Sequence, residues 1–352
     1  MSEPLVAPFP YFGGKRYAAQ IVWDAIGNVR HYVEPFAGSA AVLLAREASP
    51  ERTETINDID GYITNVWRAI QHDPDRVAEY AAWPVSELDL TARHLWLVNE
   101  GKPDRGRLET DPDYFDAKAA GWWIWGASNW IGTGWCHGDG PWTVERLQGG
   151  DGDTGQGVHR KLPHLGNTGR GVHRQLPHLG DAGQGVHRKL PHLGDAGQGV
   201  HRKQLIAWFA ALSDRLERVR ICCGDWSRVV SDAVLFGAAR SGPVAVFLDP
   251  PYCRSSGRHQ EIYANETDVA DAVAEWAFAH GNDPRLRIVL AGWDGDVALP
   301  SGWRAMEWSR PRGSGYANAT GRNTQAMERL WLSPHCIHPQ ATAKPIPLFE
   351  VA

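Results

Sequence analysis

The sequence lacks the features that would place it in a membrane, a secretory pathway or a metal-binding class. No uninterrupted apolar run of about 18 residues occurs, so we expect no membrane span. The first residues, MSEPLVAPFPYFGGK, contain neither a basic leader nor an apolar core, and we expect no secretion signal. The five cysteines form no CxxC pair, which favours a reduced cytosolic protein without a zinc site or another metal site.

Two common nucleotide-binding motifs are also missing. The segment FAGSAA has one glycine where the dinucleotide motif GxGxxG has three, so it does not predict NAD binding. The segment FGGKRY resembles the end of a phosphate-binding loop but fails the pattern GxxxxGK[ST]. ATP hydrolysis is therefore a poor interpretation.

Charge is distributed unevenly along the chain. The net charge is −5, but residues 157–203 carry eight Lys or Arg and two Asp, so they contribute +6 and the remainder −11. This segment repeats a 14-residue unit, as in GVHRQLPHLGDAGQ, with too few apolar residues for a core of its own. We predict a loop-rich insertion that either contacts phosphates or is a duplicated surface loop, and its charge favours the first. The candidate phosphate contacts are Arg160, Lys161, Arg174, Arg188 and Lys189.

Aromatic residues are concentrated before the repeat. Six of the 17 tryptophans lie in residues 121–142, where they either stack on bases or form the core of a small subdomain, the better interpretation for most of them. Asn129 in this stretch is a candidate DNA contact, with a turn or capping role as the alternative. Helical spacing predicts helices within 64–98, 204–220 and 268–280.

Acidic residues end four predicted strands. The strands HYVE, TETIND, VRICC and VAVFL lead to Glu34, Asp58, Asp225 and Asp249. In an open parallel sheet, ligands bind at the carboxyl ends of the strands, where the strand order reverses. Four acids at one such edge are more than helix capping requires, although each alone could be an N-cap.

The first of these strands begins a nucleotide-binding unit. A turn containing Gly38 follows Glu34, and SAAVLLARE is predicted to be the next helix. Asp58 follows Gly38 by 20 residues, the spacing of a carboxylate that binds ribose hydroxyls. Together with FLDPPY at residues 247–252, a single-glycine turn predicts S-adenosylmethionine (AdoMet) as the cofactor.

The segments PFPYFGGK, YVEPFAGSAAV, INDID, CGDW and FLDPPY, in this order, resemble the Dam-type N6-adenine DNA methyltransferases. The resemblance covers residues 8–60 and 219–252, with weaker similarity in IVLAGWD and RLWLSP. It implies a cytoplasmic, DNA-associated enzyme of a bacterial or phage-infected cell, acting on double-stranded DNA. The chain departs from the family pattern at Tyr11, where a Trp is usual, at Ala40, where a glycine is usual, and in its repeats.

The resemblance also implies roles for individual residues. Tyr11, Gly14 and Lys15 line the AdoMet pocket, Asp58 binds the ribose, and Asp225 lies near the adenine of the cofactor. Glu34, Phe36, Gly38 and Asp249 complete the set of expected cofactor-binding residues. Asp249, Pro250, Pro251 and Tyr252 form the catalytic pocket.

The chemistry of DPPY fits an exocyclic amine. Asp249 and the Pro250 carbonyl can accept hydrogen bonds from an adenine N6 amine, while the Tyr252 ring stacks on a base flipped out of the duplex. Cytosine N4 is chemically equivalent and stays an alternative, as does a DNA-binding scaffold with a decayed catalytic pocket.

The predicted fold class is α/β, a Rossmann-like AdoMet-dependent methyltransferase sheet with an inserted target-recognition region. Residues 1–75 and 205–352 are expected to form the catalytic domain, and 76–204 the helical, loop-rich insertion. The segment GRNTQAMERLWLSP is expected to supply the last strands. The sequence contains no signal for an oligomeric state.

Overall fold

The structure is a computed structural model of the chain. It describes residues 5–9, 11, 15–129, 135–136, 202–237, 242–251, 267–295, 297–308 and 328–337.

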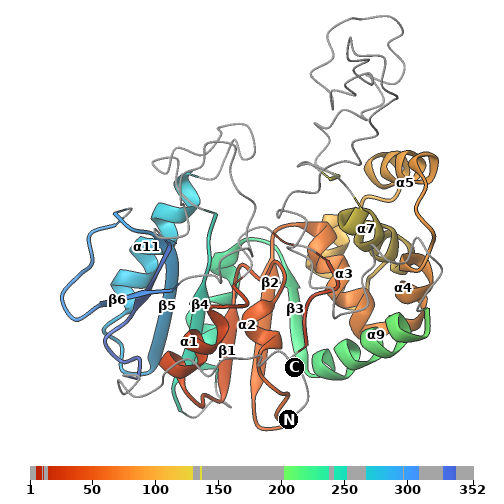
Figure 1. The fold of residues 1–352 in the computed structure, drawn as a ribbon. Helices are drawn as coiled ribbons and strands as arrows, with labels where there is room; N and C mark the ends of the chain where they lie inside the picture. Colours follow the sequence, from red (N-terminus) through yellow and green to blue (C-terminus); the bar gives the residue numbers. More distant parts are fainter. Residues whose placement is uncertain are drawn as a thin grey trace, which may run out of the picture.

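A seven-stranded sheet forms the centre of the fold, with the strand order β3-β2-β1-β4-β5-β7-β6 (Figure 1). Strands β3, β2, β1, β4 and β5 are parallel, and β7 pairs antiparallel with both β5 and β6. The strands are β1 (His31–Glu34), β2 (Thr53–Asp58), β3 (Val219–Cys223), β4 (Val244–Leu248), β5 (Leu286–Trp293), β6 (Arg304–Glu307) and β7 (Glu328–Leu332). This mixed α/β sheet confirms the predicted Rossmann-like methyltransferase fold. Its strand order reverses between β1 and β4, where such folds bind their ligands.

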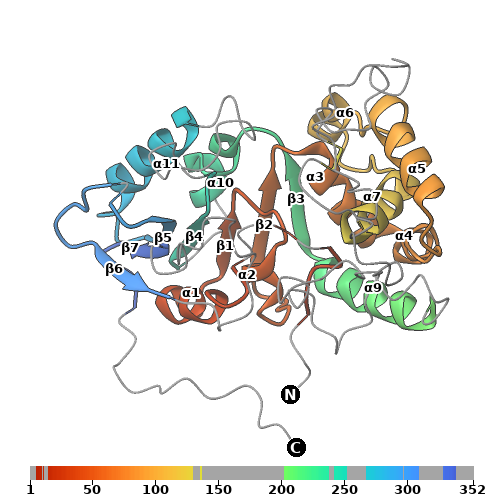
Figure 2. The same cartoon turned by 45° about the horizontal axis from the view of Figure 1, so that its top comes forward.

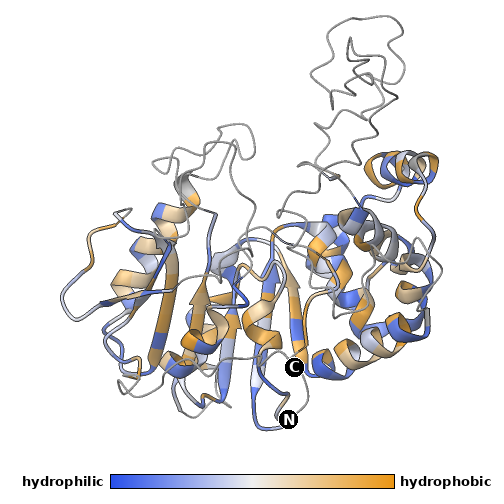
Figure 3. Ribbon diagram, viewed as in Figure 1, coloured by the Kyte–Doolittle hydropathy of each residue, from blue (hydrophilic) through white to orange (hydrophobic). Residues whose placement is uncertain are grey.

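The two faces of the sheet bury alternate residues of each strand. In β4, Ala245 and Phe247 join one apolar cluster, whereas Val244, Val246 and Leu248 join the other. This is the period of two that a strand covered on both faces requires. Figure 3 shows the resulting apolar colouring along the central strands.

Helices cover both faces. On one face lie α1 (Ala19–Ile26), α2 (Ala41–Leu44) and α3 (Gly61–His72), and on the other α10 (Asp232–Phe236) and α11 (Thr267–His280). A helical group lies beside β3 at one end of the sheet (Figure 2). Its members are α4 (Pro74–Ala81), α5 (Glu87–Asn99), α6 (Arg105–Thr110), α7 (Ala117–Asn129) and α9 (Arg202–Leu216).

Helix α3 joins the sheet to the helical group. The Asp60 side chain accepts a hydrogen bond from the Tyr62 amide and so caps the helix immediately after β2. Further along, the Arg68 guanidinium donates to the carbonyl of Ile221 in β3 and to that of Asp111 before α7. Asn65 exchanges two hydrogen bonds with the backbone of Asp116. Helix α3 therefore makes hydrogen bonds both to the sheet and to the helical group. The predicted division of the chain into domains near residue 76 stays a prediction.

Two elements differ from the sequence prediction. The helix expected over SAAVLLARE is limited to α2 (Ala41–Leu44), because Arg215 binds the carbonyl groups at its end. Nη2 and Nε of Arg215 donate to Leu43 O and Arg46 O at 2.8 and 2.7 Å. Strand β6 was not predicted, since its four residues alternate between half-buried and exposed at the edge of the sheet.

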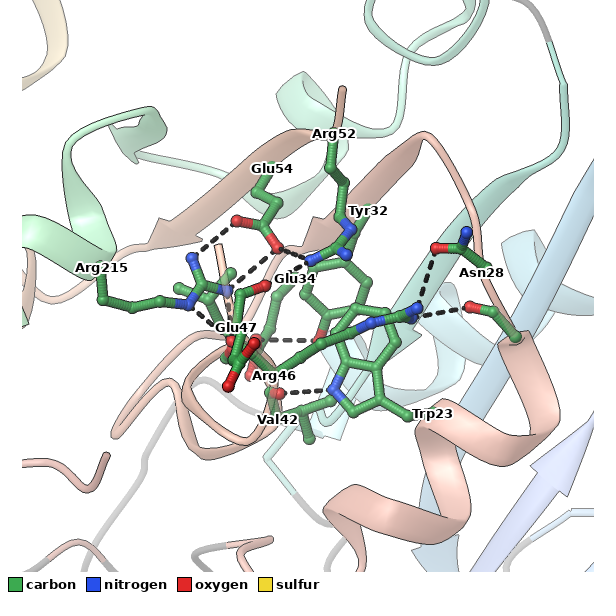
Figure 4. Close-up of polar contacts among 12 residues, drawn as sticks. Trp23, Asn28, Tyr32, Glu34, Val42, Arg46, Glu47, Arg52, Glu54 and Arg215 are labelled. Atoms are coloured by element: carbon green, nitrogen blue, oxygen red, sulfur yellow. Dashed lines mark hydrogen bonds and ion pairs between the residues drawn. The ribbon is translucent and has the colours of Figure 1, made fainter. Parts of the chain in front are cut away.

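A buried ion cluster fastens α9 to β2 (Figure 4). The Arg215 guanidinium makes two hydrogen bonds to the Glu54 carboxylate, at 2.7 and 3.0 Å, and both side chains are about 5% exposed or less. Arg52 approaches the same carboxylate at 3.0 Å. The guanidinium groups of Arg46 and Arg52 lie over the Trp23 ring. The cluster lies among β2, α1, α2 and α9, so it stabilises the scaffold beneath the loop after β1.

Replacement of Arg215 by methionine is expected to destabilise the protein by about 3–5 kcal/mol, because it removes a partner from a buried carboxylate. Urea denaturation measures the loss. The matched control is Arg285→Met, which breaks an ion pair whose arginine is 60% exposed and should cost far less stability. Equal losses at Arg215 and Arg285 would contradict this account.

Candidate active site

Four acidic residues follow the parallel strands at the carboxyl edge of the sheet. Glu34 and Asp58 are the last residues of β1 and β2, Asp249 follows β4 directly, and Asp225 comes two residues after β3. Since β3, β2, β1 and β4 are neighbours and run in the same direction, these residues lie along one edge. The edge includes the reversal of strand order between β1 and β4.

Asp249 is paired with a lysine from the beginning of the chain. Lys15 Nζ lies 2.8 Å from Asp249 Oδ1, and the lysine side chain is 3% exposed while that of Asp249 is 21% exposed. The same ammonium group lies over the Trp308 ring, 5.9 Å from its centroid. Burial strengthens the attraction between the two charges, so the lysine fixes the carboxylate at the end of β4.

The two prolines after Asp249 lie beside residues of β5 and β7. Pro250 and Pro251 line a small, mostly apolar cavity together with Gly292 of β5 and Trp331 of β7. A proline cannot donate a backbone hydrogen bond, so β4 ends here and the backbone direction is restricted.

Asp58 holds the loop that connects β1 to α2. Its Oδ2 accepts a hydrogen bond from the Gly38 amide at 2.8 Å, and its Oδ1 accepts one from the Asp60 amide at 2.9 Å. Burial, and secondarily the charge of Asp60, raise the pKa of Asp58 to about 7. Gly38 and Asp58, which are 20 residues apart in the sequence, are therefore in direct contact.

Gly38 is required by both its conformation and its surroundings. Its φ of 46° lies in the left-handed region, and a Cβ atom there would overlap the Tyr11 ring. Ala40 also adopts a left-handed conformation, with φ of 47° and ψ of 33°. An alanine costs roughly 1 kcal/mol in this region, which explains why a glycine suits the second position of the motif.

The Glu34 carboxylate is enclosed beneath this loop. Glu34 is 2% exposed, and its Oε2 accepts a hydrogen bond from the Tyr32 hydroxyl at 2.9 Å. Burial, with a smaller contribution from the charges of Asp249 and Asp58, raises the pKa of Glu34 to about 8, although bonds from Tyr32 and the Leu43 amide oppose the shift. Glu34 therefore ties β1 to α2, and it stays a predicted cofactor-binding residue.

Asp225 is exposed and begins a short 3-10 helix, η3 (Trp226–Val229), by accepting a hydrogen bond from the Ser227 amide. The adjoining Trp226 ring lies against Phe36, with centroids 6.3 Å apart and planes inclined by 28°. These two rings place an apolar surface between the loops after β1 and β3. The sequence analysis selected Phe36 but missed Trp226.

The remaining candidate residues are less informative. Asn129 ends α7, and its Nδ2 donates to Trp125 O at 2.6 Å, so its amide is engaged within its own helix. The other candidates lie outside the described residues: Gly14, Tyr252, Arg160, Lys161, Arg174, Arg188 and Lys189.

Within the part of the chain that the structure describes, no group of three or more His, Cys, Asp or Glu side chains is arranged to hold a metal ion. In the same residues, no helix is both long and apolar enough to span a membrane.

The sheet, with its reversal of strand order between β1 and β4, fits a Rossmann-like α/β methyltransferase. Residues 11–90 match the model of the D12 class N6 adenine-specific DNA methyltransferase family. The match confirms the resemblance to the Dam-type enzymes and identifies the enzyme as an adenine-specific DNA methyltransferase acting on DNA. It covers Tyr11, Lys15, Gly38 and Asp58 and ends before Asp249. No curated protein matches the chain.

Proposed function

We propose that this chain transfers a methyl group from AdoMet to the N6 amine of adenine in double-stranded DNA, by base flipping and direct in-line transfer. The observation that carries the proposal is the Lys15–Asp249 pair at the end of β4, beside the loop that Asp58 binds. The catalytic carboxylate and the cofactor loop thus occupy adjacent strands at the reversal of the sheet.

The residues at this edge fit AdoMet by their chemistry. The Asp58 carboxylate can accept hydrogen bonds from ribose hydroxyls. Phe36 and Trp226 offer an apolar surface for an adenine ring. When bound, AdoMet supplies an electrophilic methyl group on a positively charged sulfur.

Asp249 and Pro250 act on the base. The N6 lone pair of adenine is delocalised into its ring, which makes the amine a poor nucleophile. Hydrogen bonds from the amine to the Asp249 carboxylate and the Pro250 carbonyl direct the lone pair and stabilise the positive charge that develops on nitrogen. Transfer then depends mainly on alignment of the two reactants, and no covalent enzyme intermediate is required.

Base flipping is required because the target adenine is paired within a duplex. The N6 amine is hydrogen-bonded within the duplex, so the adenine has to leave the stack before it can reach Asp249. Tyr252 is proposed to stack on the extruded base, as its position in DPPY predicts.

Affinity for AdoMet is expected to increase as the pH rises from 6 to 8.5, because Asp58, with a pKa of about 7, and Glu34, with a pKa of about 8, lose their protons. The carboxylate form of Asp58 accepts ribose hydroxyls, and both negative charges attract a cation. Calorimetric titration across this range measures the effect.

The stability of the free protein is expected to change in the opposite direction. The two acids have ordinary pKa values near 4 when unfolded, so the folded state binds more protons from about pH 4 to 8 and loses stability as the pH rises. Urea denaturation at several pH values separates the two trends. An AdoMet affinity that is independent of pH would contradict the assignment of Asp58.

Deletion of residues 157–203 is expected to weaken DNA binding and to reduce its dependence on salt, because the segment carries eight Lys or Arg. The slope of log affinity against log salt concentration should fall in magnitude by roughly 0.9 for each phosphate contact that is lost. An unchanged affinity and slope would leave the repeat as a surface loop without a role in DNA binding.

The decisive experiment is incubation of the purified protein with AdoMet and unmethylated genomic DNA, followed by mass spectrometry of the nucleosides. N6-methyldeoxyadenosine is expected. N4-methyldeoxycytidine would retain the mechanism but reassign the base. The absence of any methylated nucleoside, together with an absence of AdoMet binding, would favour a DNA-binding scaffold.

A further inference from the structure

Asn57 of β2 connects the loops that follow the two neighbouring strands, β1 and β3. It precedes Asp58 in β2 and is 2% exposed. Its side-chain amide donates to Pro35 O, after β1, and to Gly224 O, after β3, each at 3.0 Å. Its backbone carbonyl accepts a hydrogen bond from the Ala37 amide at 2.9 Å.

The orientation of this side chain is determined by its two donated hydrogen bonds. Both acceptors are backbone carbonyls, so only the nitrogen end of the amide can face them. Its Oδ1 is buried and accepts no hydrogen bond from the described residues. Both amide hydrogens are therefore used to hold two separate loops at a fixed distance from β2.

These loops carry the surfaces assigned to the cofactor. Phe36 follows Pro35 directly, and Gly38 lies two residues beyond it, bonded to Asp58. On the other side, Gly224 leads to Asp225 and to the Trp226 ring, which faces Phe36. A change in the spacing between Pro35 and Gly224 would therefore move the two rings relative to each other and to Asp58.

We propose that Asn57 is a positioning residue that sets the width of the AdoMet cleft, acting through Pro35 and Gly224. The inference rests on the proposed use of AdoMet. Asn57 determines affinity for the cofactor and has little effect on DNA binding, because the loops that it holds lie at the cofactor side of the edge.

The variant Asn57→Asp tests this role with little change in side-chain volume. It replaces both donated hydrogens by an oxygen that faces two carbonyl oxygens. We expect the Kd and KM for AdoMet to increase by about 10-fold or more, the loss typical of one or two broken buried hydrogen bonds. The KM for DNA should stay within about twofold of the wild-type value.

The matched control is Asn65→Asp. Asn65 is 1% exposed and also makes two hydrogen bonds to backbone atoms, but these lie between α3 and Asp116, away from the cofactor edge. In urea denaturation Asn57→Asp should lose more stability, because it loses two donated hydrogen bonds, whereas Asn65→Asp loses one and keeps the bond that it accepts. Only Asn57→Asp should weaken AdoMet binding, whereas a merely structural role would affect the two variants alike.

A pH profile adds a second readout. At low pH the carboxyl group introduced by Asn57→Asp becomes neutral and can donate one hydrogen bond to Pro35 O or Gly224 O. The ratio of its AdoMet Kd to that of the wild type should therefore decrease as the pH is lowered from 8 to 5.5. The ratio for Asn65→Asp should stay constant and close to one.

AdoMet binding by the wild type and by the two variants decides whether Asn57 positions the cofactor loops. If the wild type binds AdoMet and the two variants bind it equally well, the positioning role is wrong and the proposed function is unaffected. If the wild type binds no AdoMet, the cofactor assignment fails and this inference fails with it. Asn57→Ala replaces Asn57→Asp if the latter does not fold, and a failure of both to fold would assign Asn57 to stability instead of cofactor binding.

Discussion

Replacement of Asp249 by alanine is expected to lower the rate of methyl transfer by at least about 10³-fold, while AdoMet still binds. In the proposed mechanism the carboxylate accepts a hydrogen bond from the N6 amine when positive charge develops on the nitrogen, so its removal acts mainly on the transition state. Single-turnover incorporation of labelled methyl groups into DNA measures the rate.

Two controls separate catalysis from folding. Asp249→Ala leaves Lys15 buried without its carboxylate, which destabilises the fold as well. Asp249→Asn keeps the size and one acceptor oxygen, so it should fold better and still lose most of the activity. Asp283→Ala, at an exposed ion pair before β5, should retain the wild-type rate. Undiminished methylation by either Asp249 variant would overturn the assignment.

Replacement of Lys15 by methionine is expected to have the second-largest effect, a reduction in kcat of about 10²-fold. The ammonium group lies 2.8 Å from Asp249 Oδ1, and its removal frees the carboxylate from its fixed position at the end of β4. A misplaced catalytic group can cost about 10²-fold in rate. The free energy of unfolding should decrease by about 3–5 kcal/mol, as for other broken buried ion pairs.

The kinetic constants distinguish two roles for Lys15. If the lysine positions Asp249, kcat falls and the Kd for AdoMet changes little. If it mainly binds the cofactor, as the family resemblance implies, the Kd for AdoMet rises and kcat at saturation is retained. The double variant Lys15→Met/Asp249→Asn should be more stable than Lys15→Met, because no isolated charge is buried. The structure favours the first role, and an increase in Kd alone would contradict it.

Much of the carboxyl edge of the sheet could be predicted from local sequence. The apolar runs before Glu34, Asp58 and Asp249 identify parallel strands, and the carboxyl ends of such strands meet at one edge. The spacing of Gly38 and Asp58 predicted a ribose-binding carboxylate, which stays a prediction, and the structure adds a hydrogen bond from the Gly38 amide to Asp58. These features depend on strand period and on short-range spacing, both of which a single sequence contains.

Contacts between distant segments could not be predicted in this way. Nothing in FGGKRY indicates that Lys15 pairs with Asp249, since that contact depends on how the N-terminal segment crosses the sheet. Asn57 was overlooked because a buried asparagine beside an acid has no distinctive pattern. The early end of α2 depends on Arg215 of α9, which is far away in the sequence.

Helix α3 has a consequence for the way in which DNA is engaged. Arg68 and Asn65 join the helical group, through Asp111 and Asp116, to the same helix whose first turn follows Asp58. A hinge motion between the helices and the sheet would have to break these part-buried hydrogen bonds, so we expect the two parts to move little relative to each other. In the proposed mechanism, the distance from the helices to Asp249 then stays nearly constant, and the distortion that brings an adenine to the carboxylate falls on the DNA. Target sites whose base steps unstack easily would be modified at the lowest energetic cost.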